Sequence, residues 1–436
     1  MDKNEIIRIL EDWNFWKKEV ETGISRSCYL QRLKEFLEAK QVVVITGPRR
    51  SGKSFIMRQF AKLLMEERVD KRNILIINFE DPRLPEMDAK ALDQVFNIYL
   101  EFLGPRGELF VFLDEVQEVS GWEKWVTTMH ELKKANLIVS GSNAKLLSKE
   151  LATVLTGRHL DLSIFPLSFK EFLTFHNILL KDELDITHHE VAIKGLLRKY
   201  IEFGSYPEVV LSEKGKETLL SYFDDILNKD LIRRYKIRKS EKLKSLTKFY
   251  LTQMASLSTY NSAAKFLDLT ADTAEKFSGY LENAYLLFFL KRFSFKLKEQ
   301  ERSPRKVYAV DTGLANAVGF RFAENLGRAA ENVVFLELLR KQALNPALEF
   351  YFWKDIHHRE VDFVLKEGLD IKELIQVCWD VSQPQVQGRE TKALLKAMGE
   401  FGLSKSLVIT EDQEFERKIK GKQIVFIPLW KWLLKD

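Results

Sequence analysis

Residues 1–180 are predicted to form an α/β fold around a parallel sheet. Short apolar runs alternate there with longer segments whose apolar residues recur at helical spacing. Parallel strands that helices cover on both faces are apolar along their whole length, as these runs are. A glycine-rich loop also follows the first run directly, as in a strand–loop–helix unit. The expected strands are residues 42–46, 74–78, 109–113, 137–140 and 160–164.

The chain continues with two segments of different character. Residues 181–250 begin with a polar stretch and then show helical spacing without strand alternation, which predicts a helical connector or lid. Residues 251–320 contain two helical segments, 261–268 and 271–283, followed by two strand-like runs. A helix-turn-helix with a two-stranded wing is the winged-helix pattern, so we expect a winged-helix domain there.

The last segment, residues 321–436, predicts a second α/β domain. It opens with a helix at 327–341 and continues with five short apolar runs. A chain of 436 residues is too long for one ordinary core, so several domains are expected. The five strand-like runs are 350–353, 361–365, 374–378, 406–410 and 424–427.

Composition and cysteine usage bear on the compartment. Hydrophobic residues make up 45% of the chain and charged residues 30%, which is typical of soluble globular proteins. The apolar runs are far shorter than the ~20 residues that a membrane-spanning helix needs. The two cysteines, Cys28 and Cys378, have no metal-ligand spacing, which fits a reducing compartment. We therefore expect a cytoplasmic protein with no membrane partner.

Positive charge is concentrated in two segments. Residues 229–244 hold eight basic and two acidic residues, and residues 291–306 hold seven basic and two acidic residues. Together they carry +11, so with a net charge of +5 the rest of the chain is at −6. Such concentration is typical of a surface that binds a polyanion such as nucleic acid. Alternatively, the segments are solvated helix faces and a loop.

The sequence GPRRSGKS, residues 47–54, matches the phosphate-binding P-loop GxxxxGK[ST]. Its glycines let the loop turn its amide groups toward phosphate oxygens, and the start of the next helix adds a positive dipole end. We expect Lys53 to contact the β- and γ-phosphates of ATP and Ser54 to bind Mg²⁺. The loop residues expected at the nucleotide are Gly47, Pro48, Arg49, Arg50, Ser51, Gly52, Lys53, Ser54 and Phe55.

A second motif follows the third expected strand. The apolar run there ends in Asp114 and Glu115, as in a Walker B strand. We expect Asp114 in the Mg²⁺ shell and Glu115 as the group that accepts a proton from the attacking water. A glutamate directly after the aspartate indicates hydrolysis rather than binding alone.

Polar residues at the ends of neighbouring strands are further candidates. Ser142 and Asn143 follow the fourth strand, where they can orient the attacking water or, alternatively, cap the next helix. Asn78 ends the second strand and can hydrogen-bond Glu115 until a ligand arrives, with local capping as the alternative. The sequence leaves these pairs of readings open.

Together these motifs resemble the AAA-type ATPases, common in archaea, that join an ATPase core to a winged helix and a C-terminal restriction-nuclease-like domain. The resemblance implies sensor roles for Asn78, Ser142 and Asn143, and an arginine finger at Arg158. Besides the P-loop, the resembling stretches are INFEDPRL, LDEVQEVSGWEKW, SGSNAKLLSKEL, LTGRHLDLSIFPLSFKEF and IPLWKWLL, which span nearly the whole chain.

An arginine finger stabilises charge on the transferring phosphoryl oxygens and raises the rate ~10³- to 10⁵-fold. If Arg158 serves a neighbouring subunit, the protein must assemble, and we expect a homo-oligomer such as a hexameric ring. Alternatively, Arg158 pairs with an acid of its own domain, such as Asp161. Arg49 and Arg50 in the P-loop are further candidates for contact with phosphate.

DNA is the expected partner of the winged helix and of the basic loop inside it. The second helix offers one lysine against two acids, so base reading is not expected, whereas the loop suits backbone phosphates. Winged helices also bind proteins, which is the alternative. The candidate DNA contacts are Lys276, Lys291, Arg292, Lys296, Lys298, Arg302, Arg305 and Lys306.

The last domain has parts of a nuclease pattern. Glu331, Asp362 and the run 375–378 fall where the PD-(D/E)XK pattern places its Glu, Asp and (D/E)xK. That chemistry uses acids to hold Mg²⁺ and a lysine to stabilise developing charge. Here Gln376 stands in place of the acid and Cys378 in place of the lysine. We therefore expect a nuclease-like fold that has lost cleavage.

These observations predict an Mg²⁺-dependent AAA-type ATPase that couples ATP hydrolysis to DNA binding, remodelling or translocation. Two alternatives remain. One is a regulatory switch ATPase that acts on protein partners through the winged helix. The other is an ATP-regulated nuclease.

Overall fold

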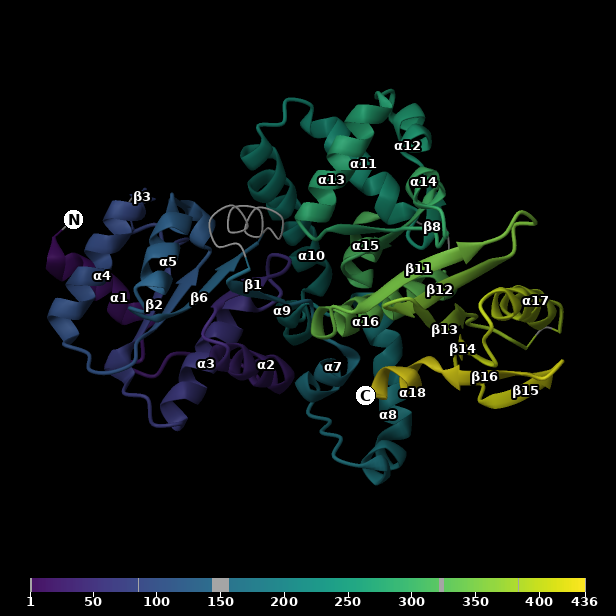
Figure 1. Ribbon diagram of the computed structural model, residues 1–436, viewed down its shortest axis with the longest axis horizontal. Coiled ribbons are helices and arrows are strands. Elements are labelled where there is room, and N and C mark those ends of the chain that lie inside the picture. Colours follow the sequence, from purple (N-terminus) through teal and green to yellow (C-terminus); the bar gives the residue numbers. More distant parts are fainter. Residues whose placement is uncertain (1, 85, 143–156, 321–324, 383, 436) are drawn as a thin grey trace. The chain divides into compact units, whose positions relative to one another are not determined.

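The computed structural model describes residues 2–84, 86–142, 157–320, 325–382 and 384–435. The chain divides into two compact units, Met1–Ile164 and Phe165–Asp436 (Figure 1). Each unit has its own sheets and its own hydrophobic core. Within the described ranges, every helix is too short or too polar to cross a bilayer.

The first unit is built on a five-stranded parallel sheet with the order β2-β4-β6-β1-β7. All five expected strands are present. Because β6 lies between β1 and β4, the C-terminal ends of these three parallel strands lie side by side, with Thr46, Asp114 and Ser140 close to one another along the sheet. The strands are β1 (Val42–Thr46), β2 (Ile74–Asn78), β4 (Phe110–Asp114), β6 (Asn136–Gly141) and β7 (His159–Ser163).

Helices cover both faces of this sheet, because the side chains of a strand alternate between its faces. Val42 and Val44 pack with α1 (Lys3–Trp13), α4 (Ala89–Leu103) and α5 (Trp122–Glu131). Val43 and Ile45 pack on the other face, with α2 (Ser27–Glu38) and α3 (Lys53–Glu66). The strands are therefore apolar throughout, as expected. The short pieces of this unit are η1 (Lys71–Asn73), β3 (Met87–Asp88), η2 (Val116–Glu118) and β5 (Val119–Ser120).

The second unit begins with a group of helices. A capping box between Ser168 and Glu171 starts the first of them, and Asp182 caps the long helix that follows. That long helix ends at Gly204, where the buried Asp311 accepts a hydrogen bond from the Ser205 amide at 2.6 Å. The helices are α7 (Phe169–Phe175), α8 (Glu183–Phe203), α9 (Pro207–Leu211), α10 (Gly215–Asp225), the π-helical η3 (Ile226–Arg233) and α11 (Ser240–Thr252).

A three-stranded antiparallel sheet, with the order β8-β10-β9, follows these helices. Its strands are β8 (Ser256–Ser258), β9 (Leu287–Leu290) and β10 (Arg305–Ala309). The two expected helices are present as α12 (Tyr260–Leu267) and α13 (Ala271–Asn283). The expected basic loop contains a short helix, α14 (Leu297–Arg302), and α15 (Thr312–Val318) follows the sheet. The winged-helix interpretation stays a prediction.

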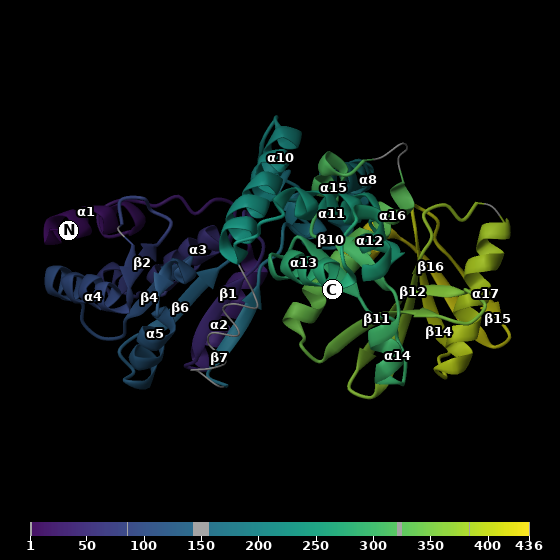
Figure 2. The ribbon, with the colours of Figure 1, turned by 90° about the horizontal axis from the view of Figure 1, so that it is seen from above.

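The C-terminal part has a six-stranded mixed sheet with the order β11-β12-β13-β14-β16-β15. Figure 2 shows α17 lying along this sheet, where its residues join a core with Val361, Leu374 and Val408. The edge strand β15 was not expected, because its middle residues are exposed and polar. The elements are α16 (Leu326–Leu344), β11 (Leu348–Lys354), β12 (Glu360–Glu367), β13 (Asp370–Val377), α17 (Pro384–Glu400), β14 (Lys405–Thr410), β15 (Phe415–Ile419), β16 (Lys422–Pro428) and α18 (Leu429–Leu434).

Candidate functional site

The P-loop joins β1 to α3 in a strained backbone path. Gly47, Arg50 and Gly52 all have positive φ, at 143°, 67° and 98°. At Gly47 a side chain is excluded, since a Cβ atom there would lie 2.1 Å from the Ile164 carbonyl oxygen. The glycines of the motif are therefore needed for the turn itself and for close packing beside β7.

Lys53 is the first residue of α3, and its side chain folds back into the loop. It is 4% exposed, and its Nζ donates to the carbonyls of Gly47 and Pro48, both at 3.1 Å. The same Nζ lies 3.6 Å from Glu115 Oε1. The ammonium thus stands between the loop and the end of β4, where it can transfer from backbone carbonyls to phosphate oxygens.

Asp114 ends β4 next to two hydroxyl groups. The Ser140 hydroxyl donates to Asp114 Oδ1 and also accepts from the Glu115 amide at 3.1 Å. Burial, and then the neighbouring Glu115, raise the pKa of Asp114, while hydrogen bonds from Ser140 and Ser54 oppose the shift. Ser54 and Asp114, the two expected Mg²⁺ ligands, therefore lie side by side.

Glu115 turns sharply away from the strand. Its backbone is left-handed, with φ of 54°, and its carboxylate is buried. Oε1 faces Lys53, and Oε2 accepts a hydrogen bond from Gln117 Nε2 at 2.6 Å. A non-glycine residue in this conformation is held there by its surroundings, a situation that is concentrated at functional sites.

The structure does not test the sensor roles predicted for the other residues at the strand ends. Asn78 Oδ1 accepts a hydrogen bond from the Glu80 amide at 2.9 Å, which is the local capping arrangement. Ser142 is buried at the end of β6. Asn143 lies outside the described residues. The sensor roles of all three remain predictions.

Arg158 lies near the N-terminal end of β1, whereas the P-loop follows the C-terminal end of the same strand. Its carbonyl accepts a hydrogen bond from the amide of Val42, the first residue of β1, whereas the loop follows Thr46, the last. A strand rises about 3.3 Å per residue, so five residues separate the two ends by roughly 15 Å. The Arg158 side chain is 54% exposed and pairs with Glu131 at 2.8 Å, not with Asp161. Arg158 therefore lies too far from the P-loop of its own chain to contact a nucleotide there, and it is paired with an acid of its own domain, as in the alternative reading; the arginine-finger role stays a prediction.

Three residues near the loop are not among the predicted site residues. Arg26 is buried, lies over the Tyr29 ring and donates through Nη1 to the Ser51 carbonyl at 2.8 Å. Ser140 and Gln117 position Asp114 and Glu115, as described above. Ser140 carried a usable signal, because it is a hydroxyl near the end of the strand beside β4. Arg26 carried none, because its contact joins segments 25 residues apart.

Two further residues that were expected at the nucleotide, Arg49 and Phe55, have different surroundings. Arg49 pairs with Glu80 at 2.6 Å, so it is engaged with an acid of its own unit. Phe55 is 39% exposed, and the Arg58 guanidinium lies 5.2 Å from its ring centre. Nucleotide contacts by these two residues stay predictions.

The site fits ATP and Mg²⁺. Mg²⁺ prefers oxygen ligands and commonly takes only one or two from the protein, with the rest from phosphates and water. The adjacent Ser54 hydroxyl and Asp114 carboxylate match that demand. The loop amides and Lys53 supply the positive partial charges that a triphosphate needs.

Most of the expected DNA contacts are engaged within the protein. Lys291 and Arg305 pair with Glu301, Lys296 pairs with Glu299, and Arg292 Nη2 donates to the Lys354 carbonyl. Lys276, Lys298 and Arg302 are exposed. The prediction of Lys306 as a DNA contact is wrong, because the residue is buried. It is on β10, 2% exposed, and surrounded by carboxylates that make burial of its charge tolerable.

The nuclease-like residues also come together. Glu331 on α16 and Asp362 on β12 both contact Lys306, and Gln376 on β13 accepts a hydrogen bond from the Asp362 amide at 3.1 Å. Cys378 is buried just after β13, and burial raises the pKa of its thiol to about 12. Glu331, Asp362 and Gln376 therefore lie close together, and Lys306 stands between the two acids; the nuclease-like assignment stays a prediction.

Three parts of the chain match protein-family models. Residues 39–173 match an AAA domain, residues 194–327 match a domain of unknown function, DUF8612, and residues 326–432 match another, DUF4143. The AAA match includes the P-loop, Asp114, Glu115 and Arg158.

Two relatives are similar over most of their length. The uncharacterized protein MJ1544 of Methanocaldococcus jannaschii is 33% identical over 408 residues, 90% of this chain and 88% of that protein. An uncharacterized protein of Haemophilus influenzae is 30% identical over 416 residues, 93% of this chain and 98% of that protein. Among solved structures, the Walker-type ATPase PABY2304 of Pyrococcus abyssi has 16% identity and a TM-score of 0.47, over 70% of this chain and 99% of that chain.

Proposed function

The chain belongs to the same protein family as MJ1544 of Methanocaldococcus jannaschii, and we propose that it is an Mg²⁺-dependent ATPase. Its first unit contains a P-loop AAA-type domain. The observation that carries the proposal is the meeting of Lys53, Asp114 and Glu115 inside one buried site. A binding loop, a metal-binding acid and a base are together what ATP hydrolysis requires.

The residues divide the work as follows. The loop amides and Lys53 hold the phosphates and neutralise their charge, and Ser54 and Asp114 would hold Mg²⁺. Bound Mg²⁺ supplies further charge neutralisation at the phosphates. Glu115 accepts the proton of the attacking water. For this, its carboxylate must leave Lys53, which moves to the phosphates when ATP binds.

The direct test is Lys53→Ala. We expect it to retain no ATP under conditions where the unaltered protein does, and to hydrolyse ATP at least ~10²-fold more slowly, because the phosphates lose their main cation. Retention of labelled ATP and phosphate release measure the two effects. Lys62→Ala is the matched control, because Lys62 is an exposed lysine on the same helix. Normal turnover in Lys53→Ala would contradict the proposal.

We further propose that the chain is a cytoplasmic protein that binds DNA through its second unit, which includes a winged helix at 251–320. The helices α12 and α13 and the sheet β8-β10-β9 support this domain assignment. Cys28 is exposed and Cys378 is buried, and they form no disulfide. The specific support for DNA is the first basic segment, not the second.

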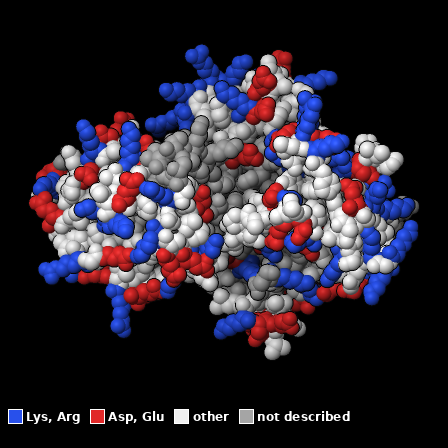
Figure 3. Space-filling model, in the orientation of Figure 1, with Lys and Arg blue, Asp and Glu red and all other residues white. Residues whose placement is uncertain are grey.

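A basic turn that runs from the last residue of η3 to the start of α11 offers the positive surface. We use this name for Arg233, Lys236, Arg238 and Lys239, all of which are exposed. In the part of the chain that the structure describes, none of the four has a carboxylate within ion-pair distance. Figure 3 shows lysine and arginine side chains projecting at the top of the view, where this segment lies. These cations are available to phosphates.

The basic turn also adjoins α13. Tyr235 stacks on Tyr280 of α13 with ring centres 3.8 Å apart, and Lys276 Nζ lies 6.0 Å from the centre of the Tyr280 ring. Lys276, one of the expected DNA contacts, therefore stands beside the basic turn. Together they form a surface suited to the phosphate backbone rather than to bases.

We expect glutamine at all four positions of the basic turn to weaken DNA binding and to reduce the salt slope by about 3 to 4, at ~0.9 per lost phosphate contact. Fluorescence anisotropy between low and moderate salt measures both. The matched control replaces Lys296, Lys298, Arg302 and Arg305, which removes the same charge from the second segment. If the control variant alone bound DNA more weakly, the proposal that DNA binds at the basic turn would be contradicted. If DNA changes neither binding nor ATPase rate, a regulatory switch that acts on protein partners becomes the better proposal.

A further inference from the structure

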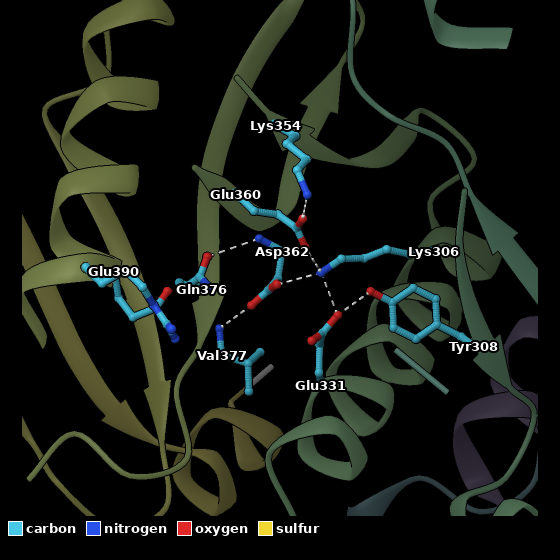
Figure 4. A network of polar contacts seen from close by, with 10 residues as sticks. Lys306, Tyr308, Glu331, Lys354, Glu360, Asp362, Gln376, Val377 and Glu390 are labelled. Carbon is cyan, nitrogen blue, oxygen red and sulfur yellow. Dashed lines mark hydrogen bonds and ion pairs between the residues drawn. The ribbon is translucent and has the colours of Figure 1, made fainter. Parts of the chain in front are cut away.

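A buried charge cluster joins β10 to the C-terminal sheet (Figure 4). Lys306 Nζ lies at its centre, 2.9 Å from Glu331 Oε1, 2.8 Å from Glu360 Oε1 and 2.7 Å from Asp362 Oδ1. An ammonium group has three N–H donors. Two of them donate to Glu331 and Asp362, and the ion pair with Glu360 makes Lys306 an internal cation with three carboxylate partners.

Further donors hold these carboxylates from other sides. Each acid thus has a second protein donor besides Lys306, and these donors fix the orientation of each acid. The contacts are from the Tyr308 hydroxyl to Glu331 Oε1 at 2.7 Å, from the Val377 amide to Asp362 Oδ2 at 2.9 Å, and from Lys354 Nζ to Glu360 Oε2 at 3.0 Å.

Gln376 occupies the place of the third acid. Its Oε1 accepts from the Asp362 amide, and its Nε2 donates to Glu390 Oε2 at 2.8 Å. The amide is bound at both ends and adds no negative charge. Among the described residues, no three His, Cys, Asp or Glu side chains are placed to hold a metal ion. The residues therefore do not fit the divalent metal that the nuclease pattern implies.

Three carboxylates in one buried cluster need a cation to balance their charge. Lys306 supplies it, because its Nζ lies within 2.9 Å of an oxygen of each acid and its side chain is 2% exposed.

We propose that Lys306 is the resident cation of this cluster and replaces the divalent metal of a PD-(D/E)XK nuclease. The side chain of Lys306, which comes from β10 of the neighbouring three-stranded sheet, occupies the position that the metal would need. The C-terminal domain then has no metal-dependent cleavage, and the former metal ligands tie β10 to α16 and β12. This proposal does not depend on ATPase activity.

The experiment measures Mn²⁺ binding to the full chain in an Asp114→Asn background, which removes the expected metal ligand near the P-loop. We expect Lys306→Met to bind one Mn²⁺ at least about tenfold more tightly than the chain with Lys306, because a positive charge among three carboxylates has been removed. Mn²⁺ should also raise the unfolding temperature of that variant. Adding Asp362→Asn should abolish both effects.

Lys354→Met is the matched control, because it removes a lysine from Glu360 but leaves Lys306 in place. It should gain no Mn²⁺ site. A folded Lys306→Met chain without a new site would overturn the proposal. The proposal would also be overturned if the chain with Lys306 bound Mn²⁺ and Asp362→Asn abolished that binding. If the chain with Lys306 shows no such binding, the proposal is supported. This second comparison remains decisive if Lys306→Met does not fold.

Discussion

Glu115→Gln should bind ATP and fail to hydrolyse it. The substitution keeps the size of the side chain but removes the basic carboxylate, so the attacking water loses its proton acceptor. General-base catalysis contributes about 10²- to 10⁴-fold, and we expect phosphate release to fall by that factor. Binding should stay the same or tighten, because Lys53 loses a competing carboxylate 3.6 Å away.

Glu118→Gln is the control for this experiment. Glu118 follows in the same segment but is exposed, so its loss should change neither binding nor turnover. Binding is measured with a fluorescent ATP analogue and turnover by phosphate release. If Glu115→Gln turns over at the normal rate, another group activates the water and the role given to Glu115 is wrong.

Arg158→Ala is the second prediction with a large effect. Arg158 lies at the end of β1 opposite its own P-loop, so the arginine-finger prediction requires that it act on the nucleotide of a neighbouring subunit. An arginine finger is worth ~10³- to 10⁵-fold. We expect that loss in turnover with little change in ATP affinity. Glu131→Ala should retain activity, because it releases Arg158 from its own unit.

Mixing two inactive variants separates a trans-acting arginine from a structural one. Glu115→Gln subunits supply Arg158, and Arg158→Ala subunits supply Glu115. If the arginine acts across an interface, the mixture regains part of the activity that each variant lacks alone. A mixture that stays inactive, or a protein that remains monomeric with ATP, would contradict this mechanism. The mass in solution, measured with and without ATP, shows which state is present.

The catalytic candidates could be predicted because their signals are local. A P-loop is eight adjacent residues with fixed backbone demands, and the end of β4 is an apolar run with two acids after it. The five strands of the first sheet were equally visible, since buried parallel strands are apolar on both faces. The edge strand β15 was not visible, because one exposed strand carries no apolar run.

The partners of these residues depend on the tertiary structure. Ser140 meets Asp114 only because β6 lies beside β4, and Arg26 meets Ser51 only because the chain before β1 crosses the loop. Sheet order and register decide such contacts. Neither could be predicted from a local sequence pattern, because the residues that pair lie far apart in the chain.

Lys306 shows the difference most clearly. By sequence it is one cation among seven in a basic stretch. By structure it is buried among Glu331, Glu360 and Asp362, which are 25 to 56 positions away. The sequence by itself determined the nucleotide-binding loop, the acids of its site and the course of the strands, because each is a local pattern. Only the packing of β10 against the C-terminal sheet decided that Lys306 neutralises Glu331, Glu360 and Asp362, because the pairing of buried charges depends on their distance in space.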